Sequence, residues 1–171
     1  MTRELLDRAL VEEASKKSGL VWVKGAGAAA ARALWHVWHD GAVCLVGDGP
    51  GEQPLEGLVD GGSAEVTVRS KDKGGRLVTF PVTVSELRSG SEEWEAAVAE
   101  LKGKRLNAPD GEAMPARWAR ECRVLRLTPA GPVAPLPDGS LAEQPVATPA
   151  TTRKPVPAGL PRLLMKRRKR R

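Results

Sequence analysis

The stretch ALWHVWHDGAVCLVG, residues 33–47, decides the fold. Asp40 and Gly41 separate two apolar runs of strand length. This dipeptide suits a two-residue type I′ turn, because both turn positions require a positive φ that Gly and Asp tolerate better than most residues. We therefore expect residues 34–39 and 42–47 to form an antiparallel hairpin.

Both faces of this predicted hairpin are apolar. Side chains alternate along a strand, so one side of the first strand carries Trp35, Val37 and His39 and the other carries Leu34, His36 and Trp38. A hairpin exposed on one side would have one polar face. We therefore expect cover on both sides, from a barrel interior on one and from a helix or a partner subunit on the other.

The flanking sequence predicts an α+β domain. Apolar residues at helical spacing indicate helices at 3–18, 91–102 and 115–120, and the first of them has the stripe Leu5, Leu6, Ala9, Leu10 and Ala14. Strands are expected at 20–24, 65–71, 76–86 and 122–128. Pro81 lacks a backbone donor, which favours an edge or a bulge at that point of its strand.

The positive charge belongs to the end of the chain. The net charge is +6, but nine of the 27 Lys and Arg residues lie at or after position 153, so residues 1–152 carry 18 basic and 21 acidic residues. We expect one domain over residues 1–130 and a disordered, Pro-rich linker with a basic tail over 131–171. The run from Lys166 to Arg171 could contact nucleic acid or an acidic surface weakly, or simply remain solvated.

The sequence has no charged-then-apolar leader and no apolar run of about 18 residues, the length that crosses a bilayer. We therefore expect a soluble cytoplasmic protein without a transmembrane segment. Cys44 and Cys122 lie in strand-like runs and are expected to be buried, reduced thiols.

Few side chains suggest chemistry. His36 and His39 are three apart on a strand and point to opposite faces, which argues against a shared metal ion. They could orient a ligand, although a strand histidine is more often structural. The sequence has no G-x-S-x-G motif and no cysteine beside a plausible general base. We therefore predict no catalytic residue and no metal site.

A cationic cluster surrounds the turn at Gly74 and Gly75, and it contains Arg69, Ser70, Lys71, Lys73 and Arg76. Guanidinium groups, a hydroxyl and backbone N–H groups suit a phosphate monoester. The alternative is a solvated hairpin tip. Residues 47–62, GDGPGEQPLEGLVDGG, form a long loop without Lys or Arg; it could hold a phosphate only through backbone N–H groups, or merely connect two strands.

Several short sequence segments lie between or within the predicted elements, namely WHVWHDG at 35–41, EQPLEGL at 52–58, VTVRSKDKGGRLVTF at 66–80, KRLN at 104–107 and RWARECRVLRL at 117–127. With the leading helix, they cover residues 4–129. In this order they resemble the FMN-binding split-barrel proteins related to pyridoxamine 5′-phosphate oxidase, in an uncharacterised branch.

The resemblance implies a homodimeric, six-stranded antiparallel split β-barrel with flanking helices. It also implies FMN, or the deazaflavin analogue, at the subunit interface. The ring would pack near Trp35 or Trp38, and the phosphate would bind Arg69, Ser70, Lys71 and Lys73. The flavin itself supplies the redox chemistry.

One departure bears on the activity. The loop that carries a basic residue for the phosphate in many members reads Glu52-Gln53-Pro54 here. Either the cationic turn holds the phosphate, or flavin binding is weak or lost. The sequence thus predicts a flavin-dependent oxidoreductase acting on a small molecule. The alternatives are a non-catalytic dimeric ligand-binding module and a deazaflavin-dependent reductase.

Overall fold

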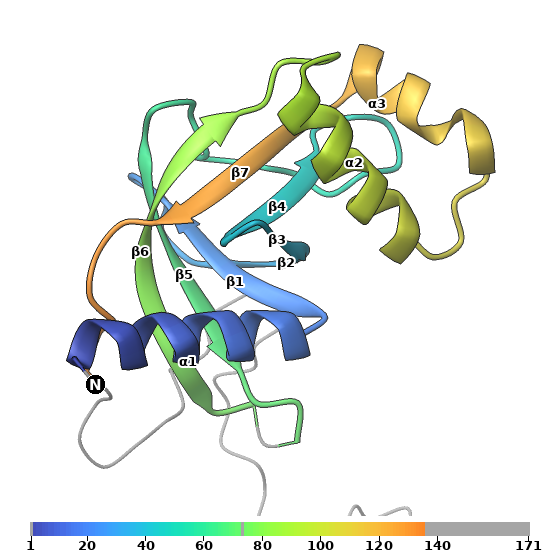
Figure 1. Cartoon of the computed structure of the whole chain (residues 1–171). Helices are drawn as coiled ribbons and strands as arrows, with labels where there is room; N and C mark the ends of the chain where they lie inside the picture. Colours follow the sequence, from blue (N-terminus) through green and yellow to red (C-terminus); the bar gives the residue numbers. More distant parts are fainter. Residues whose placement is uncertain (1, 73, 136–171) are drawn as a thin grey trace, which may run out of the picture.

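The computed structural model describes residues 2–72 and 74–135, which fold around one curled antiparallel sheet (Figure 1). The helices are α1 (Arg3–Lys17), α2 (Glu92–Lys104), the 3₁₀ helix η1 (Gly111–Ala113) and α3 (Met114–Glu121). The strands are β1 (Leu20–Gly25), β2 (Arg32–Trp35), β3 (Val37–His39), β4 (Ala42–Gly47), β5 (Ser63–Arg69), β6 (Arg76–Glu86) and β7 (Arg123–Pro129). The α+β class is confirmed.

The sheet has seven strands in the order β2-β1-β5-β6-β7-β4-β3, so the prediction of six was wrong. Residues 34–39 do not form one strand, because the chain breaks at His36. Before the break Leu34 pairs with Val21 of β1, and after it Val37 pairs with Cys44 of β4. These partners lie toward opposite ends of the sheet order, so the chain must leave one ladder before it joins the other.

The turn at Asp40 and Gly41 is confirmed, with φ of 45° and 74° as a type I′ turn requires. Cover on both faces is also confirmed, since every residue of β4 is buried. Val43 and Leu45 belong to the core inside the curled sheet. Cys44 and Val46 belong to a second core between the sheet and α2 and α3.

The helices over the second core match the sequence pattern. Ser91 caps α2, its Oγ accepting a hydrogen bond from the Trp94 N–H at 3.2 Å. The buried stripe of α2 is the predicted one, namely Trp94, Ala97, Val98 and Leu101. Met114 and Trp118 are the buried residues of α3.

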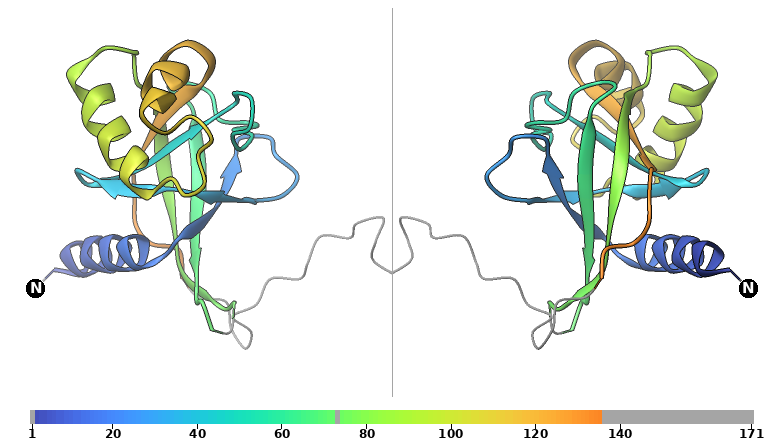
Figure 2. Two further views of the ribbon diagram at one scale, coloured as in Figure 1. Left: turned by 90° about the vertical axis from the view of Figure 1, so that its right-hand side faces the viewer. Right: turned by 90° about the vertical axis from the view of Figure 1, so that its left-hand side faces the viewer.

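Helix α1 forms where predicted, but its stripe does not pack as predicted. Leu5, Leu6 and Leu10 are 54%, 53% and 46% exposed, and Val11 and Ser15 are its buried residues. Figure 2 shows why: α1 extends sideways from the barrel, and its N-terminal half has no described part of the chain beside it. The apolar pattern is real, but the surface that would cover it is absent from residues 2–72 and 74–135.

The chain after β7 runs along the half of β6 that β7 does not pair with. The Ala130 N–H donates to the Pro81 carbonyl at 2.9 Å, and the Ala134 N–H donates to the Thr79 carbonyl at 2.8 Å. β6 is an inner strand of the sheet, so the prediction of an edge at Pro81 was wrong. The β6–β7 ladder starts at Val82, and Pro81 therefore lies just beyond its end. The remainder of the predicted linker and tail, including Lys166 to Arg171, lies outside the described residues. Within the described chain, no helix has the length and apolar character needed to cross a bilayer.

Candidate functional site

The outer surface of β2, β1 and β5 carries Leu20, Trp22, Trp35 and Arg69, and we call it the tryptophan face. Leu20 is paired with Trp35 across β1 and β2. Trp22 is paired with Thr67 of β5, and Arg69 is the next residue of β5 on the same face. The alternate residues Val21 and Val23 are in the barrel core, so the tryptophan face lies on the other side of the sheet, where Trp35 also packs against Trp118 of the second core.

Each tryptophan of this face lies under an arginine. The guanidinium carbon of Arg69 is 5.0 Å from the centre of the Trp22 ring. That of Arg105 is 5.6 Å from the Trp35 ring. Both distances suit cation–π attraction. The face therefore combines flat aromatic surfaces with positive charge.

The structure brings together only part of the residue set predicted from the sequence. Trp35 and Arg69 share the tryptophan face. Trp38 points to the opposite side, where it packs against the barrel core. Ser70 and Lys71 lie in the turn after β5, where the Ser70 N–H donates to the Gly75 carbonyl at 2.8 Å. Lys73 lies outside the described residues.

Three residues near this face were missed from the sequence. Trp22 could have been found, because it alternates with two buried valines on a short strand and so must lie on the other face. Arg105 and Arg117 gave no such signal. They reach the site from the end of α2 and from α3, and only the fold brings these positions together.

The loop after β4 binds its own chain. The Glu52 side chain is 1% exposed, and its Oε1 accepts hydrogen bonds from Arg117 and from the Trp118 indole N–H, both at 3.1 Å. Arg117 also pairs with Asp110, and this hydrogen bond is the main cause of the lowered Asp110 pKa. The carboxylate is thus committed to an internal ion-pair network.

Gln53 joins two strands through its side-chain amide. Its carbonyl oxygen accepts from the Trp35 N–H at 2.9 Å, and its Nε2 donates to the Trp35 carbonyl at 2.9 Å and to the Val46 carbonyl at 3.2 Å. The amide therefore makes the hydrogen bonds that a neighbouring strand would make with β2. Neither Glu52 nor Gln53 needs a ligand to explain its position.

His36 and Cys44 have structural surroundings. His36 is buried, and its Nε2 donates to the Ser15 carbonyl at 3.0 Å. Burial is the main cause that lowers its pKa to about 4, so the ring is neutral at pH 7. Cys44 is also buried, and burial raises the pKa of its thiol to about 11. Among the described residues, no group of His, Cys, Asp or Glu could hold a metal ion.

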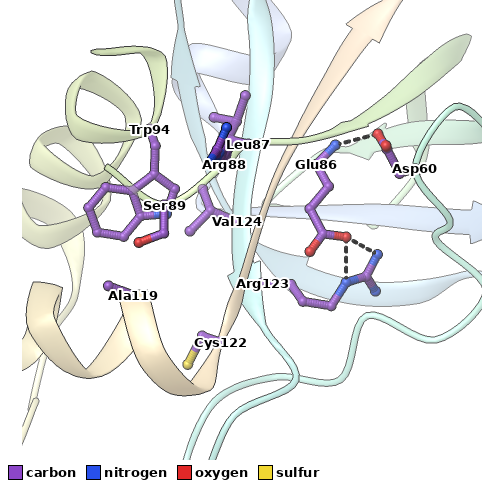
Figure 3. A pocket seen from close by; sticks show the side chains of 10 residues that line it. All are labelled: Asp60, Glu86, Leu87, Arg88, Ser89, Trp94, Ala119, Cys122, Arg123 and Val124. Atoms are coloured by element: carbon purple, nitrogen blue, oxygen red, sulfur yellow. Dashed lines mark hydrogen bonds and ion pairs between the residues drawn. The ribbon is translucent and has the colours of Figure 1, made fainter. Parts of the chain in front are cut away.

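Two cavities lie away from the tryptophan face. One, of about 360 Å³, lies between the end of β6, the start of α2 and the end of α3 (Figure 3). In its lining Arg123 pairs with Glu86, and the Glu86 backbone N–H donates to Asp60. The other, of about 390 Å³, is lined mainly by the loop at residues 26–30 together with Glu56 and Gly57.

Comparison with solved structures finds similarity of fold at low identity. HutZ, the heme storage protein from Vibrio cholerae, is 14% identical with a TM-score of 0.53, over 72% of this chain and 90% of that one. An F420 reductase is 12% identical with a TM-score of 0.46, over 70% and 93%. An FAD and heme binding protein from Mycobacterium smegmatis is 14% identical with a TM-score of 0.41, over 94% and 92%.

No protein-family model matches the sequence, and no characterised protein matches it significantly. Identities this low concern the fold alone. The resemblance to split-barrel proteins of the pyridoxamine 5′-phosphate oxidase type is thus confirmed as a structural one. The chain has a split-barrel fold similar to that of HutZ.

Proposed function

We propose that this chain is a homodimeric split-barrel protein that binds a flavin-type cofactor, FMN or its deazaflavin analogue, and acts as an oxidoreductase on a small molecule. The tryptophan face is the observation that carries the proposal. A planar ring gains stacking energy on an indole, and an anionic group gains charge-assisted hydrogen bonds from a guanidinium. Trp22 with Arg69 offers both within one surface.

The residues present fit such a cofactor on the tryptophan face and not at the loop after β4. The arginines beside that loop, Arg105 and Arg117, already face the buried Glu52 carboxylate. In this proposal the phosphate is held by Arg69, Ser70 and Lys71, the cationic cluster at the end of β5. A bound flavin supplies hydride transfer, while the chain binds the ring, orients it and neutralises its charge.

The dimer is supported by apolar surface next to the same site. Leu20 is 45% exposed on β1, the strand of Trp22, and Leu77 is 48% exposed on β6, which is separated from β1 by β5. Exposed apolar patches of this kind mark interaction surfaces. A second copy laid over the tryptophan face would cover these leucines and exclude water from a bound ring. Light scattering of the full chain should give twice the monomer mass, and Leu20→Glu should halve it.

The test of the cofactor begins with the visible spectrum of the purified full-length protein. It continues with titrations of FMN, the deazaflavin analogue and haem, followed by tryptophan fluorescence. Trp22→Leu and Arg69→Gln should each weaken flavin binding about tenfold, because a stacking or cation–π contact contributes roughly 1–2 kcal/mol. Trp38→Phe is the matched control on the opposite face and should leave the affinity unchanged. A colourless protein that takes up neither flavin refutes the proposal.

The second candidate is a ligand-binding module without redox activity. The internal pairing of Glu52 favours it, because that pairing leaves the loop without a cation for a phosphate. Turnover separates the two candidates. Oxidation of a reduced nicotinamide with an electron acceptor, lost in Lys71→Ala, supports the oxidoreductase. Ligand uptake without any turnover supports the module.

A further inference from the structure

Two arginines and one tryptophan, from two separate parts of the chain, surround one buried carboxylate. Arg105 comes from the residue after α2, and Arg117 and Trp118 come from α3. Their common target is Glu52. Guanidinium and indole N–H groups can only donate, so the position they surround suits a negatively charged acceptor.

The donors are held in place without the help of Glu52. Arg117 also binds Asp110 and donates to the Pro50 carbonyl at 3.3 Å. Arg105 donates to the carbonyls of Leu106 at 3.1 Å and Gly51 at 3.3 Å. The two arginine side chains are only 24% and 18% exposed. The site would therefore keep its shape and its positive charge if the carboxylate left.

The Glu52 carboxylate does not make a hydrogen bond to every one of the three residues around it. Its Oε1 has two good hydrogen bonds, but Oε2 lies 3.4 Å from Arg105 Nε and neither of these two atoms makes a hydrogen bond. A buried polar atom without a hydrogen bond is unusual and costly. A ligand with more oxygen atoms than a carboxylate could meet Arg105 while keeping the bonds to Arg117 and Trp118.

We propose that Arg105, Arg117 and Trp118 form an oxyanion-binding site that the chain fills with its own Glu52. An exogenous phosphate or carboxylate binds there only when Glu52 is displaced or removed. In the intact protein the tethered carboxylate has the advantage of a high effective concentration. Glu52 thereby excludes phosphate groups from the loop after β4, whatever the cofactor bound on the tryptophan face.

Removal of the side chain tests this site directly. Glu52→Ala deletes the atoms of one acetate ion, so acetate or phosphate can replace them. Thermal unfolding of the full-length protein should be followed at pH 7 in sodium chloride, acetate or phosphate at equal ionic strength. In chloride the variant should melt about 10 °C below the wild type, because two buried cations lose a partner. About 100 mM acetate or phosphate should restore roughly 4 °C.

The matched control is Glu56→Ala, which removes a 68%-exposed carboxylate of the same loop. Neither this variant nor the wild type should respond to the anion. Equal shifts in all three proteins, or no shift in Glu52→Ala, would overturn the proposal, and a response to acetate alone would overturn the phosphate assignment. If Glu52→Ala does not fold in chloride, it should fold in phosphate, and failure to fold in any of the three salts counts against the site. Because no flavin is present, the result is independent of the cofactor proposal.

Discussion

Protonation of His36 should destabilise the fold as the pH falls below neutrality. The pKa of this imidazole is lowered to about 4 in the folded protein, first by burial, which the Ser15 hydrogen bond partly opposes, and then by the charge of Lys104. In the unfolded chain a histidine titrates near its usual value of about 6.5. Between these two values the unfolded chain binds a proton that the folded protein does not, so stability is complete above pH 6.5 and decreases toward pH 4.

The size of the effect follows from the two pKa values. Lowering the pH from 7.5 to 4.5 should cost the wild type about 2.5 kcal/mol of unfolding free energy through His36 alone. Urea unfolding, followed by tryptophan fluorescence at several pH values and at one protein concentration, measures this cost. His36→Gln keeps a donor for the Ser15 carbonyl but cannot titrate, so its stability should depend on pH less steeply by that amount.

His39→Gln is the control, because it removes the other imidazole of the chain. It should keep the steep pH dependence of the wild type. The carboxylates are common to all three proteins and cancel in the comparison. The reasoning fails if the wild type and His36→Gln lose stability in parallel, or if His39→Gln also loses the steep dependence.

Three other predictions follow from the packing. Gln53→Leu should cost about 3 kcal/mol in urea unfolding, because it leaves the hydrogen-bonding groups of Trp35 and the Val46 carbonyl without their partner; a loss below 0.5 kcal/mol would contradict this role. Gly25→Ala should cost about 1–3 kcal/mol, since its Cβ would lie 2.3 Å from the Gly57 carbonyl oxygen, whereas Gly19→Ala has open space and should melt like the wild type. A thiol reagent at pH 8 should label Cys122 in the folded protein and label Cys44 only on unfolding, because Cys44 is fully buried with a raised pKa; equal labelling rates would contradict the burial of β4.

The parts of the fold that local physics determines were predictable. The type I′ turn follows from Asp40 and Gly41, and the burial of α2 follows from its spacing of apolar residues. The break at His36 was not, because residues 34–39 contain no Gly or Pro that would end a strand. The first strand ends only because its ladder partner and that of the next strand lie far apart in the sheet. The exposure of the apolar stripe of α1 was not predictable either. The spacing of the apolar residues in α1 predicts burial, but the sequence does not show whether the same chain provides the surface that covers them.

The candidate site was predictable only in part for the same reason. Arg69 could be named from the cationic cluster in the sequence and Trp35 from the family resemblance, but their common face depends on β1 lying between β2 and β5. The loop residues Glu52 and Gln53 stood out as a departure from the expected basic residue. Their true contacts come from α3 and β2, which are far away in sequence. Long-range neighbours of this kind leave no periodic signal.

The bonds made by Gln53 have a consequence for how this barrel can deform. β2 and β3 are the two outermost strands of the sheet. Trp35 of β2 is joined to Val46 of β4 by the side-chain amide of Gln53 and not by a backbone ladder. A ladder opens by breaking many bonds in succession, whereas one rotamer change of a glutamine releases three at once. The sheet could therefore widen between Trp35 and Val46 without the unfolding of any strand.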